Sequence, residues 1–497
     1  MTTTTSALTA RVRRLLDDAS LAVADNPRLG AAVRAATARM DEPLRVAIAG
    51  KVKAGKSTLL NALVGEQLAP TDASECTRIV TWYRNGLTYR VFAVPAGQEP
   101  RQARFTRDGG ALNVVLDDLH LDPDDVERLE VEWPSAALRE FTLIDTPGIA
   151  SLTQATSDRA VEFLAPSDDT PTAADAVIYL LRHIHPSDRK LLEAFRDDDL
   201  AQPTPVNSIG VLSRADEIGS ARIDALTSAR AIAERYKRDS SLRRLCQTVV
   251  PVAGLVAQGG ATLQQGEFNA LGQLTQMPPA DLDKRLLTVD RFIADDPSVP
   301  VVAGLREQLL ERFGLFGVRL GVALIRQGVA ANAGALAHEL VRRSGLDELR
   351  AVLRAQFADR AHVLKARSAL LEVEAVLRDP TAGRTDDLLA NVESIRASAH
   401  EFAELRLLNQ CRAGQIDLRE AEMTEAERLL GTEGTTVHER LGLPLDASAQ
   451  SVRSAVLDSV TRWRRRAESP LSSRPVANAA EVLARTGEGL LSSLDGT

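Results

Sequence analysis

The stretch GKVKAGKST at residues 50–58 constrains the fold of this chain more than any other part of the sequence. It follows the apolar run LRVAIAG at 44–50 and leads into STLLNALVG at 57–65, which has helical character. A glycine-rich loop between a strand and a helix is typical of a phosphate-binding loop (P-loop), whose backbone amides wrap a β-phosphate. Lys56 would reach the β- and γ-phosphate oxygens, and the Ser57 hydroxyl would ligate Mg²⁺. We therefore expect a nucleotide site formed by Gly50, Lys53, Ala54, Gly55, Lys56, Ser57 and Thr58.

Short apolar runs recur after this loop, and most are separated by segments with helical spacing. This alternation is the sequence signature of an α/β domain built on a largely parallel sheet. We expect the domain to cover residues 44–312. The expected strands are LRVAIAG at 44–50, RIVTWY at 78–83, FTLID at 141–145, DAVIYLL at 175–181, SIGVLS at 208–213 and TVVPVAG at 248–254.

The remaining parts of the chain have helical periodicity and lack strand signals. Residues 1–43 predict two helices with a break at Asn26-Pro27, and residues 313–497 predict a helical neck and stalk. Two of the stalk helices would be long, roughly 65 Å each at 1.5 Å per residue. We expect an elongated all-α bundle to which the N-terminal helices add. Its expected helices after residue 313 cover 334–378, 385–431, about 448–467 and about 475–493.

Two further motifs are candidates for the γ-phosphate side of the site. Asp145-Thr-Pro-Gly148 ends a hydrophobic strand, where the Asp145 carboxylate can hold Mg²⁺ through water and the Gly148 amide can face the γ-phosphate. Thr77 precedes a strand and is the expected switch threonine, which would close over Mg²⁺ and the attacking water. Thr71 is the alternative for that role, and Thr77 could also simply begin the strand.

We expect the residues that select the nucleotide base to lie at Ser213-Arg-Ala-Asp216, after the strand SIGVL. An aspartate here can accept two hydrogen bonds from the guanine edge that adenine cannot supply, so Asp216 favours guanine. The usual GTPase pattern has Asn or Thr and then Lys where this chain has Ser213 and Arg214, yet an arginine head can still lie along the base. The segment Val252-Ala253-Gly254, after the last strand, could present an amide to the guanine carbonyl, and Ala253 is the residue expected to do so.

Composition and charge exclude several classes of protein. The formal net charge of −8 and the sequence pI near 5.6 disfavour nucleic acid as a partner. The three cysteines are far apart and lack the short spacing of a zinc site or redox pair, which favours a reduced, cytoplasmic protein. The first twenty residues lack an uninterrupted apolar core, so we expect no signal peptide. The most apolar helical stretch, residues 314–325, is too short to span a bilayer and is flanked and interrupted by arginines, so any membrane contact is expected to be peripheral.

Together, GKVKAGKST, ECTR, DTPG and SRAD in a large G domain flanked by helices resemble the dynamin superfamily, specifically its bacterial dynamin-like proteins. Within it the chain is most similar to the isoniazid-induced pair of actinobacteria, and its length matches the shorter of the two. The resemblance implies Mg²⁺-dependent GTP hydrolysis coupled to remodelling of the inner membrane. It also implies pairing of G domains, either in a homodimer or with a related dynamin-like chain, and stalk tips that meet lipid.

One departure from the dynamin pattern concerns the P-loop itself. Where dynamins have Gln followed by Ser, which help to position water and a monovalent cation, this chain has Val52 and Lys53. Ile149, the residue after DTPG, offers no glutamine either. We hypothesise that the Lys53 ammonium replaces the cation and stabilises charge on the leaving phosphate. Alternatively, Lys53 points to solvent or to a partner subunit.

The sequence offers two candidate contacts with an anionic phospholipid membrane. The first is the loop around Leu441, Leu443 and Leu445, and the second is the basic cluster that contains Trp463 and Arg465. Packing at a bundle corner would explain the leucines equally well. A solvated helix end would explain the basic cluster, because cations favour helix C-termini.

Two other functions remain open from the sequence. The altered SRAD motif is compatible with an accessory or scaffold protein that binds nucleotide, turns over slowly and works with a second dynamin-like chain. A GTPase of ribosome assembly or tRNA modification is disfavoured by the acidic charge and by the lack of a recognisable RNA-binding module.

Overall fold

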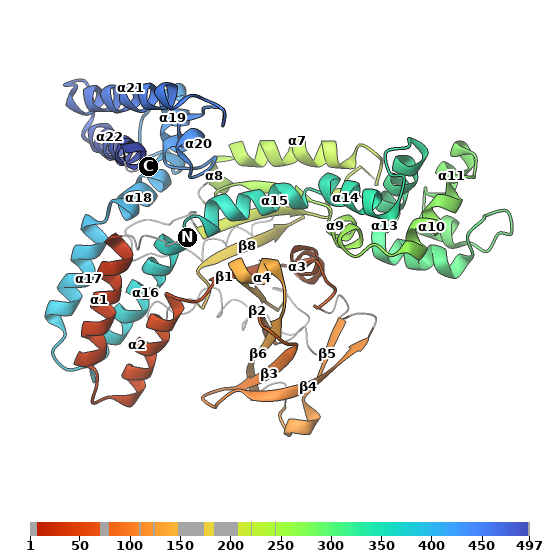
Figure 1. Ribbon diagram of the computed structural model, residues 1–497, viewed down its shortest axis with the longest axis horizontal. Coiled ribbons are helices and arrows are strands. Elements are labelled where there is room, and N and C mark those ends of the chain that lie inside the picture. Colours follow the sequence, from red (N-terminus) through yellow and green to blue (C-terminus); the bar gives the residue numbers. More distant parts are fainter. Residues whose placement is uncertain are drawn as a thin grey trace.

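A mixed ten-stranded sheet runs through the computed structural model of the chain, with helices packed around it (Figure 1). The structure describes residues 7–69, 79–108, 111–122, 125–147, 173–182, 207–219, 221–243 and 245–495. The helices α10–α13 extend to one side of the sheet, at the right of Figure 1. Two further groups of helices lie on the opposite side, one above the other.

The sheet has the strand order β10-β9-β8-β1-β7-β2-β6-β3-β4-β5. From β10 to β7 all neighbouring strands are parallel, and β1 lies between β8 and β7. Six of the seven residues of β1 are buried, which fits its nearly continuous apolar sequence, because parallel strands are covered on both faces. The predicted α/β class is confirmed. The strands are β1 (Leu44–Gly50), β2 (Val80–Asn85), β3 (Arg90–Pro95), β4 (Arg101–Asp108), β5 (Ala111–Val115), β6 (Val126–Trp133), β7 (Phe141–Asp145), β8 (Ala176–Leu181), β9 (Ser208–Ser213) and β10 (Val249–Val252).

Four strands, β3 to β6, were not expected from the sequence. β2 pairs antiparallel with β7 and parallel with β6, and β3, β4 and β5 extend this side of the sheet with antiparallel pairs. In β4, RQARFTRD, polar residues outnumber apolar ones, so no apolar run marks it. Exposed antiparallel strands of this kind carry a weaker sequence signal than buried parallel strands.

Helices on the sheet and beside β10 complete this part of the molecule. A core cluster joins α9 to α10–α14, and another joins α15 to the sheet itself. The helices that contact the sheet or extend from it are α3 (Lys56–Val64), α4 (Ala136–Glu140), α7 (Ala225–Arg238), α8 (Ser240–Arg243), α9 (Gly254–Ala261), α10 (Gln265–Leu274), α11 (Pro279–Arg285), α12 (Val289–Ile293), α13 (Ala303–Arg326), α14 (Ala333–Arg343) and α15 (Leu346–Leu353).

The remaining helices form two groups. The N-terminal helices share one hydrophobic core with α16 and α17, and we call these four helices the neck; Phe402 of α18 is also buried in this core. The helices after residue 399 share another core, and we call residues 400–495 the distal module. The neck consists of α1 (Ala7–Ala22), α2 (Pro27–Arg39), α16 (Ala361–Leu377) and α17 (Asp386–Ser398), and the distal module of α18 (His400–Arg412), α19 (Glu420–Leu429), α20 (Val437–Leu441), α21 (Ala449–Glu468) and α22 (Arg474–Asp495).

The two long helices expected over 334–378 and 385–431 are wrong, because each is broken. The first is interrupted at Gly345, whose φ is 86° and where a Cβ atom would lie 2.1 Å from the Pro251 carbonyl oxygen. Only glycine permits this close approach to β10. The second is interrupted at Ala399 and again near Gly414. The shorter helices expected near 448–467 and 475–493 are present as α21 and α22.

The domain boundary expected between residues 312 and 313 falls inside α13. Beyond it, Leu346, Leu349 and Leu353 of α15 are buried in the same cluster as the strands β1 and β7. The last strand signal in the sequence therefore does not mark the end of the domain. The hydrophobic core of the sheet instead continues into helices that follow that signal.

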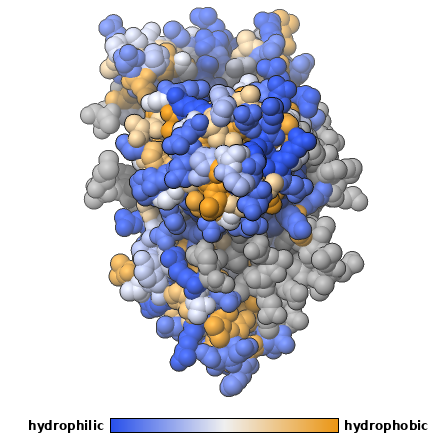
Figure 2. Space-filling view, turned by 90° about the vertical axis from the view of Figure 1, so that its right-hand side faces the viewer, coloured by the Kyte–Doolittle hydropathy of each residue, from blue (hydrophilic) through white to orange (hydrophobic). Residues whose placement is uncertain are grey.

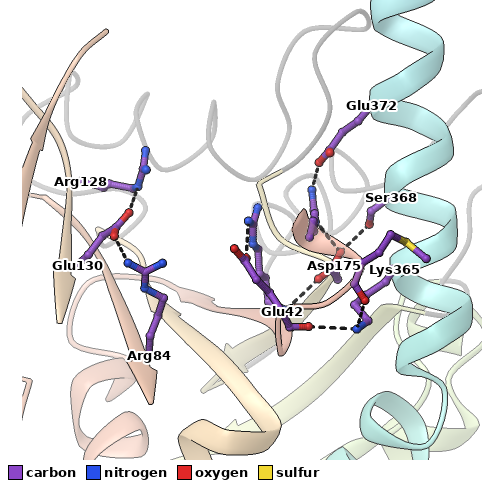
Figure 3. Close-up of polar contacts among 11 residues, drawn as sticks. Glu42, Arg84, Arg128, Glu130, Asp175, Lys365, Ser368 and Glu372 are labelled. Carbon is purple, nitrogen blue, oxygen red and sulfur yellow. Dashed lines mark hydrogen bonds and ion pairs between the residues drawn. The ribbon is translucent and has the colours of Figure 1, made fainter. Parts of the chain in front are cut away.

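A buried charged network joins the neck to the sheet (Figure 3). Asp175, just before β8, accepts hydrogen bonds from Arg39 of α2 at 2.7 Å and from the Ser368 hydroxyl of α16 at 2.7 Å. It also accepts from the Arg45 backbone amide of β1 at 2.9 Å. Arg39 forms a second ion pair with Glu372 of α16. Burial opposes the charge of Arg39, but the two carboxylates raise its pKa overall, so Arg39 stays protonated.

Replacing Asp175 with alanine should lower the free energy of unfolding by about 3 kcal/mol, because it leaves Arg39 buried with only part of its charge compensated. The matched control is Asp41→Ala, which removes an exposed ion pair with Arg13 and should cost less than about 1 kcal/mol. Urea denaturation followed by circular dichroism measures both. Equal losses for the two variants would contradict a structural role for the buried network.

Candidate functional site

The loop between β1 and α3 has the backbone geometry of a phosphate cradle. Gly50 and Gly55 have φ values of 150° and 94°, and a Cβ atom on Gly50 would lie 3.0 Å from the Leu180 carbonyl oxygen. Lys53 adopts a left-handed φ of 60° without being glycine. The loop therefore turns tightly at the carboxyl end of the central strand, where parallel α/β sheets bind ligands.

Lys56, Ser57 and Asp145 meet at this loop. The Lys56 ammonium donates to the carbonyls of Gly50 at 3.3 Å and Lys51 at 3.4 Å. Its pKa is lowered by burial, an effect that the Asp145 carboxylate partly offsets. The Ser57 hydroxyl donates to Asp145 Oδ2 at 3.0 Å, while Asp145 Oδ1 is buried without a hydrogen-bond partner. Burial raises the pKa of Asp145, against the opposing influence of Lys56 and Ser57.

These groups fit a hard divalent cation such as Mg²⁺. Asp145 has a buried oxygen that lacks a partner, and the Ser57 hydroxyl lies beside it. Within the described ranges, no cluster of three His, Cys, Asp or Glu residues forms a cage for a metal. Mg²⁺ at such sites is usually held by one or two protein oxygens together with phosphate and water. The expected ligand Thr77, its alternative Thr71 and the expected Gly148 contact lie outside the described residues.

A cavity of about 130 Å³ lies next to the P-loop, between the ends of β8, β9 and β10. It is several times larger than the ~30 Å³ that one water molecule occupies in the liquid. Its lining includes Ala54, Thr58, Ser213, Arg214, Asp216 and Gly254. Asp216 is 6% exposed, and burial raises the pKa of its carboxyl to about 6. The P-loop and SRAD motifs are thus brought together around one cavity.

Arg214 connects the base side of the site to the P-loop. It has a left-handed φ of 52°, and its guanidinium donates to the Lys53 carbonyl at 2.8 Å and to Glu217 at 2.6 Å. The Ser213 hydroxyl instead donates to the Leu181 carbonyl at 3.1 Å, which ties β9 to β8. Glu217, which is not among the predicted site residues, also pairs with Arg182 at 2.5 Å. Only its position directly after the SRAD motif could have indicated it.

The expected role of Ala253 is wrong in this structure. Its backbone amide donates to the Ser344 carbonyl at 2.9 Å, so it is not available to a guanine carbonyl. The neighbouring residues Val252, Gly254 and Leu255 line the cavity instead. Ser344, between α14 and α15, could not have been connected to this loop without knowledge of the fold.

The expected membrane residues differ in their exposure. Leu445 is 80% exposed, Leu441 and Leu443 are partly buried, and Arg465 is exposed. Trp463 is 1% exposed, and its indole N–H donates to Glu425 at 3.2 Å, so the expected interfacial aromatic is a core residue.

The described residues supply no helix both long and apolar enough to cross a membrane. Hydrophobic residues on the face shown in Figure 2 form separate small groups among hydrophilic ones. That face thus offers scattered apolar side chains and hydrophilic surface between them.

Comparisons with known proteins agree with this geometry. The model of the Dynamin family matches residues 46–215 of the chain. The chain is also 42% identical over 454 residues to the isoniazid-induced protein IniC of Mycobacterium tuberculosis, and the match covers 91% of each chain. The isoniazid-induced protein IniA of the same organism is 30% identical over 144 residues, which cover 27% of this chain and 22% of IniA. The expected resemblance to the isoniazid-induced pair is confirmed.

A solved structure of an oligomerised bacterial dynamin pair is also similar to this chain. The identity is 12% and the TM-score 0.33, with 100% of this chain and 77% of that chain covered.

Guanine nucleotide should bind more weakly below pH 6. The ionised Asp216 carboxylate would accept two hydrogen bonds from guanine, and protonation at its pKa of about 6 would remove that capacity. The dissociation constant of GDP should rise about tenfold per pH unit below 6 and level off above about pH 7. Fluorescence titration with a labelled GDP measures this.

The control for this titration is Asp216→Asn, because phosphate groups themselves titrate near pH 6. The variant keeps the titration of the nucleotide and loses that of the side chain. A pH profile in the variant that parallels the wild type would assign the effect to phosphate and contradict the role of Asp216.

Proposed function

The chain belongs to the dynamin family, and from this premise we propose that it binds GTP with Mg²⁺, hydrolyses it, and couples hydrolysis to remodelling of a membrane. The observation that carries the proposal is the contact of Ser57 with Asp145 beside Lys56. Phosphoryl transfer is catalysed mainly by positioning and charge stabilisation, and these three side chains supply both. The cavity beside Asp216 adds the selection of guanine.

Each residue of the site has a separate task in this proposal. Lys56 would neutralise charge on the β- and γ-phosphates, and Ser57 and Asp145 would hold Mg²⁺. The cation, when bound, offsets negative charge that develops on the phosphates. By resemblance to the family, Thr77 would close over the attacking water, and the Gly148 amide would face the γ-phosphate. The buried Asp216 and the Arg214 bridge keep the base side fixed relative to the P-loop.

Lys53 occupies the position where dynamins arrange a monovalent cation. Its carbonyl is held by Arg214, while its side chain is exposed at the mouth of the loop. The bridge fixes the backbone in a left-handed turn and leaves the ammonium unrestrained by it. We propose that this ammonium stabilises charge on the leaving phosphate, in place of potassium.

The rate of GTP hydrolysis should therefore be nearly the same in potassium, sodium and choline chloride at equal ionic strength. Lys53→Ser, which restores the serine found in dynamins, should lower the rate about tenfold or more and make it depend on potassium. The measurement is phosphate release under saturating GTP. A wild-type enzyme that requires potassium would overturn this role for Lys53.

Hydrolysis would produce movement through the G domains. G domains would pair as a homodimer or with a related dynamin-like chain, and this pairing would move the helical regions against a bilayer. The protein would act from the cytoplasm on the inner face of the membrane. Exposed Leu445 and Arg465 are retained as candidate contacts with anionic lipid.

A second candidate function is that of an accessory partner with little activity of its own. The departures at Ser213 and Arg214 favour it. The geometry disfavours it, because Arg214 still bridges to the P-loop and Asp216 still lines a buried cavity.

The experiment that tests the proposal measures GTP hydrolysis and vesicle shape together. Wild-type protein should hydrolyse GTP and deform vesicles that contain anionic lipid, and Lys56→Ala should lower the rate at least a hundredfold and abolish deformation. Lys51→Ala, which removes a different lysine from the same loop, should retain both activities. Activity that appears only after a related dynamin-like chain is added would favour the accessory function.

A further inference from the structure

A glycine kinks α13 directly behind the cavity on the base side of the site. Gly314 has φ 66° and ψ 173°, while the rest of α13 is helical, so the helix consists of two segments joined at this residue. This pair of angles is essentially confined to glycine. Such a conformation persists only where the surrounding contacts fix it, and conformations of this kind are concentrated at functional sites.

The kink contacts two residues that form the wall of the cavity. A Cβ atom on Gly314 would lie 3.7 Å from Oδ2 of Asp216 and 3.6 Å from Cδ1 of Leu255. Both Asp216 and Leu255 line the cavity. The helix therefore approaches the Asp216 carboxylate with a residue that has no side chain.

The segment of α13 before the kink is fixed on α9 and α10. A Cβ atom on Gly259 of α9 would lie 2.6 Å from the Phe313 ring, so the two helices are in close contact there. Arg312 pairs with Glu267 of α10 at 2.7 Å and donates to the Thr262 carbonyl at 2.8 Å. This segment thus provides a fixed base for the kink.

The segment after the kink holds the chain that follows Asp216. Arg319 donates to the Ala221 carbonyl, and it also donates to the Leu286 carbonyl at 2.9 Å. Ala221 has a left-handed φ of 56°, which is uncommon for a residue with a Cβ atom and indicates that its contacts hold it in place. The helix α13 therefore contacts this part of the chain twice, at the Asp216 carboxylate and at the Ala221 carbonyl.

The angles at Gly314 set the direction of the second segment relative to the first. Alanine at this position has to adopt other angles, because it is excluded from this region of backbone conformation. The first segment is fixed on α9, so the change displaces the second segment and Arg319 with it. The carboxylate of Asp216 then loses the position that both contacts give it.

We propose that Gly314 is a positioning residue for the selection of guanine. Its kink holds the Asp216 carboxylate where it can accept hydrogen bonds from both N1–H and the 2-amino group of the base. Gly314 acts through Asp216 rather than on the nucleotide. The inference rests on the guanine binding in the proposed function, and it requires neither hydrolysis nor a membrane.

The test compares the dissociation constants of GDP and inosine diphosphate, which lacks the 2-amino group. Their ratio reports recognition of the base, because the ribose and phosphates are the same and a loss of folded protein affects both constants equally. Wild-type protein should bind GDP about tenfold or more tightly than inosine diphosphate, as expected for one hydrogen bond to a charged group. Competition against a fluorescent GDP, at a pH well above the pKa of Asp216, measures both.

Gly314→Ala should lower this ratio to about threefold or less, mainly because GDP binds more weakly. Asp216→Ala, which removes the carboxylate itself, should bring the ratio to about one and so defines the lower limit. The matched control is Gly304→Ala in the same helix, where the added Cβ atom would meet nothing within 4 Å. This control should keep the wild-type ratio.

If Gly314→Ala does not fold, Arg319→Met tests the second contact without changing the backbone angles. Methionine keeps an unbranched apolar stem and loses the donors to Ala221, so the ratio should fall about threefold. Its control is Arg326→Met in the same helix, because Arg326 donates to the carbonyls of Leu274 and Met277 instead. The control should again keep the wild-type ratio.

The outcomes separate this inference from the proposed function. A wild-type ratio in folded Gly314→Ala, or in Arg319→Met where Gly314→Ala does not fold, would overturn the positioning role and leave the proposed function intact. A ratio of about one in the wild-type protein would overturn it through Asp216, even if the protein hydrolyses GTP. A wild-type protein that binds neither nucleotide would contradict the proposed function and this inference together. A lowered ratio in the variants, with both controls unchanged, supports the proposal.

Discussion

The carboxylate of Asp175 is the interaction on which the arrangement of this molecule depends. It binds the first residues of β1 through the Arg45 amide, the N-terminal helices through Arg39, and α16 through Ser368. β1 then runs for seven residues to Gly50, where the P-loop begins. One buried strand of roughly 20 Å thus joins the neck to the nucleotide site. The contacts of the neck and the P-loop thus lie at opposite ends of the same buried strand.

The two ends of the neck are joined to their neighbours by different contacts. At one end, Arg39 forms buried ion pairs with Asp175 and Glu372. At the other end, the neck continues into the distal module at Ala399, and Phe402 of α18 is buried in the core of the neck. The first joint thus depends on buried charge and the second on apolar packing.

Much of the site could be predicted from the sequence, because its residues are close together along the chain or follow strands. The P-loop, Asp145 and the SRAD motif each occur at the end of a recognisable apolar run. The predictions that were wrong share one cause, which is contact between segments that are distant in the sequence. The Ala253 amide is occupied by Ser344, Trp463 is buried against Glu425, and α15 packs on the sheet because Gly345 fits against Pro251. The predicted continuous helix over 385–431 failed at Ala399, where local preference and tertiary contacts disagree.

Contacts between distant segments also explain why the base motif has arginine at position 214, where the usual GTPase pattern has lysine. Seven of the sixty basic residues are lysine, and three of these lie between residues 51 and 56. At position 214 the chain needs a planar head that can reach the Lys53 carbonyl and Glu217 together, which arginine provides. At position 56 it needs a compact charge that a single long stem delivers to phosphate, which lysine provides. The base motif thus departs from the usual pattern at position 214, where a bridge is required. The P-loop keeps its lysine at position 56, where a point charge is required.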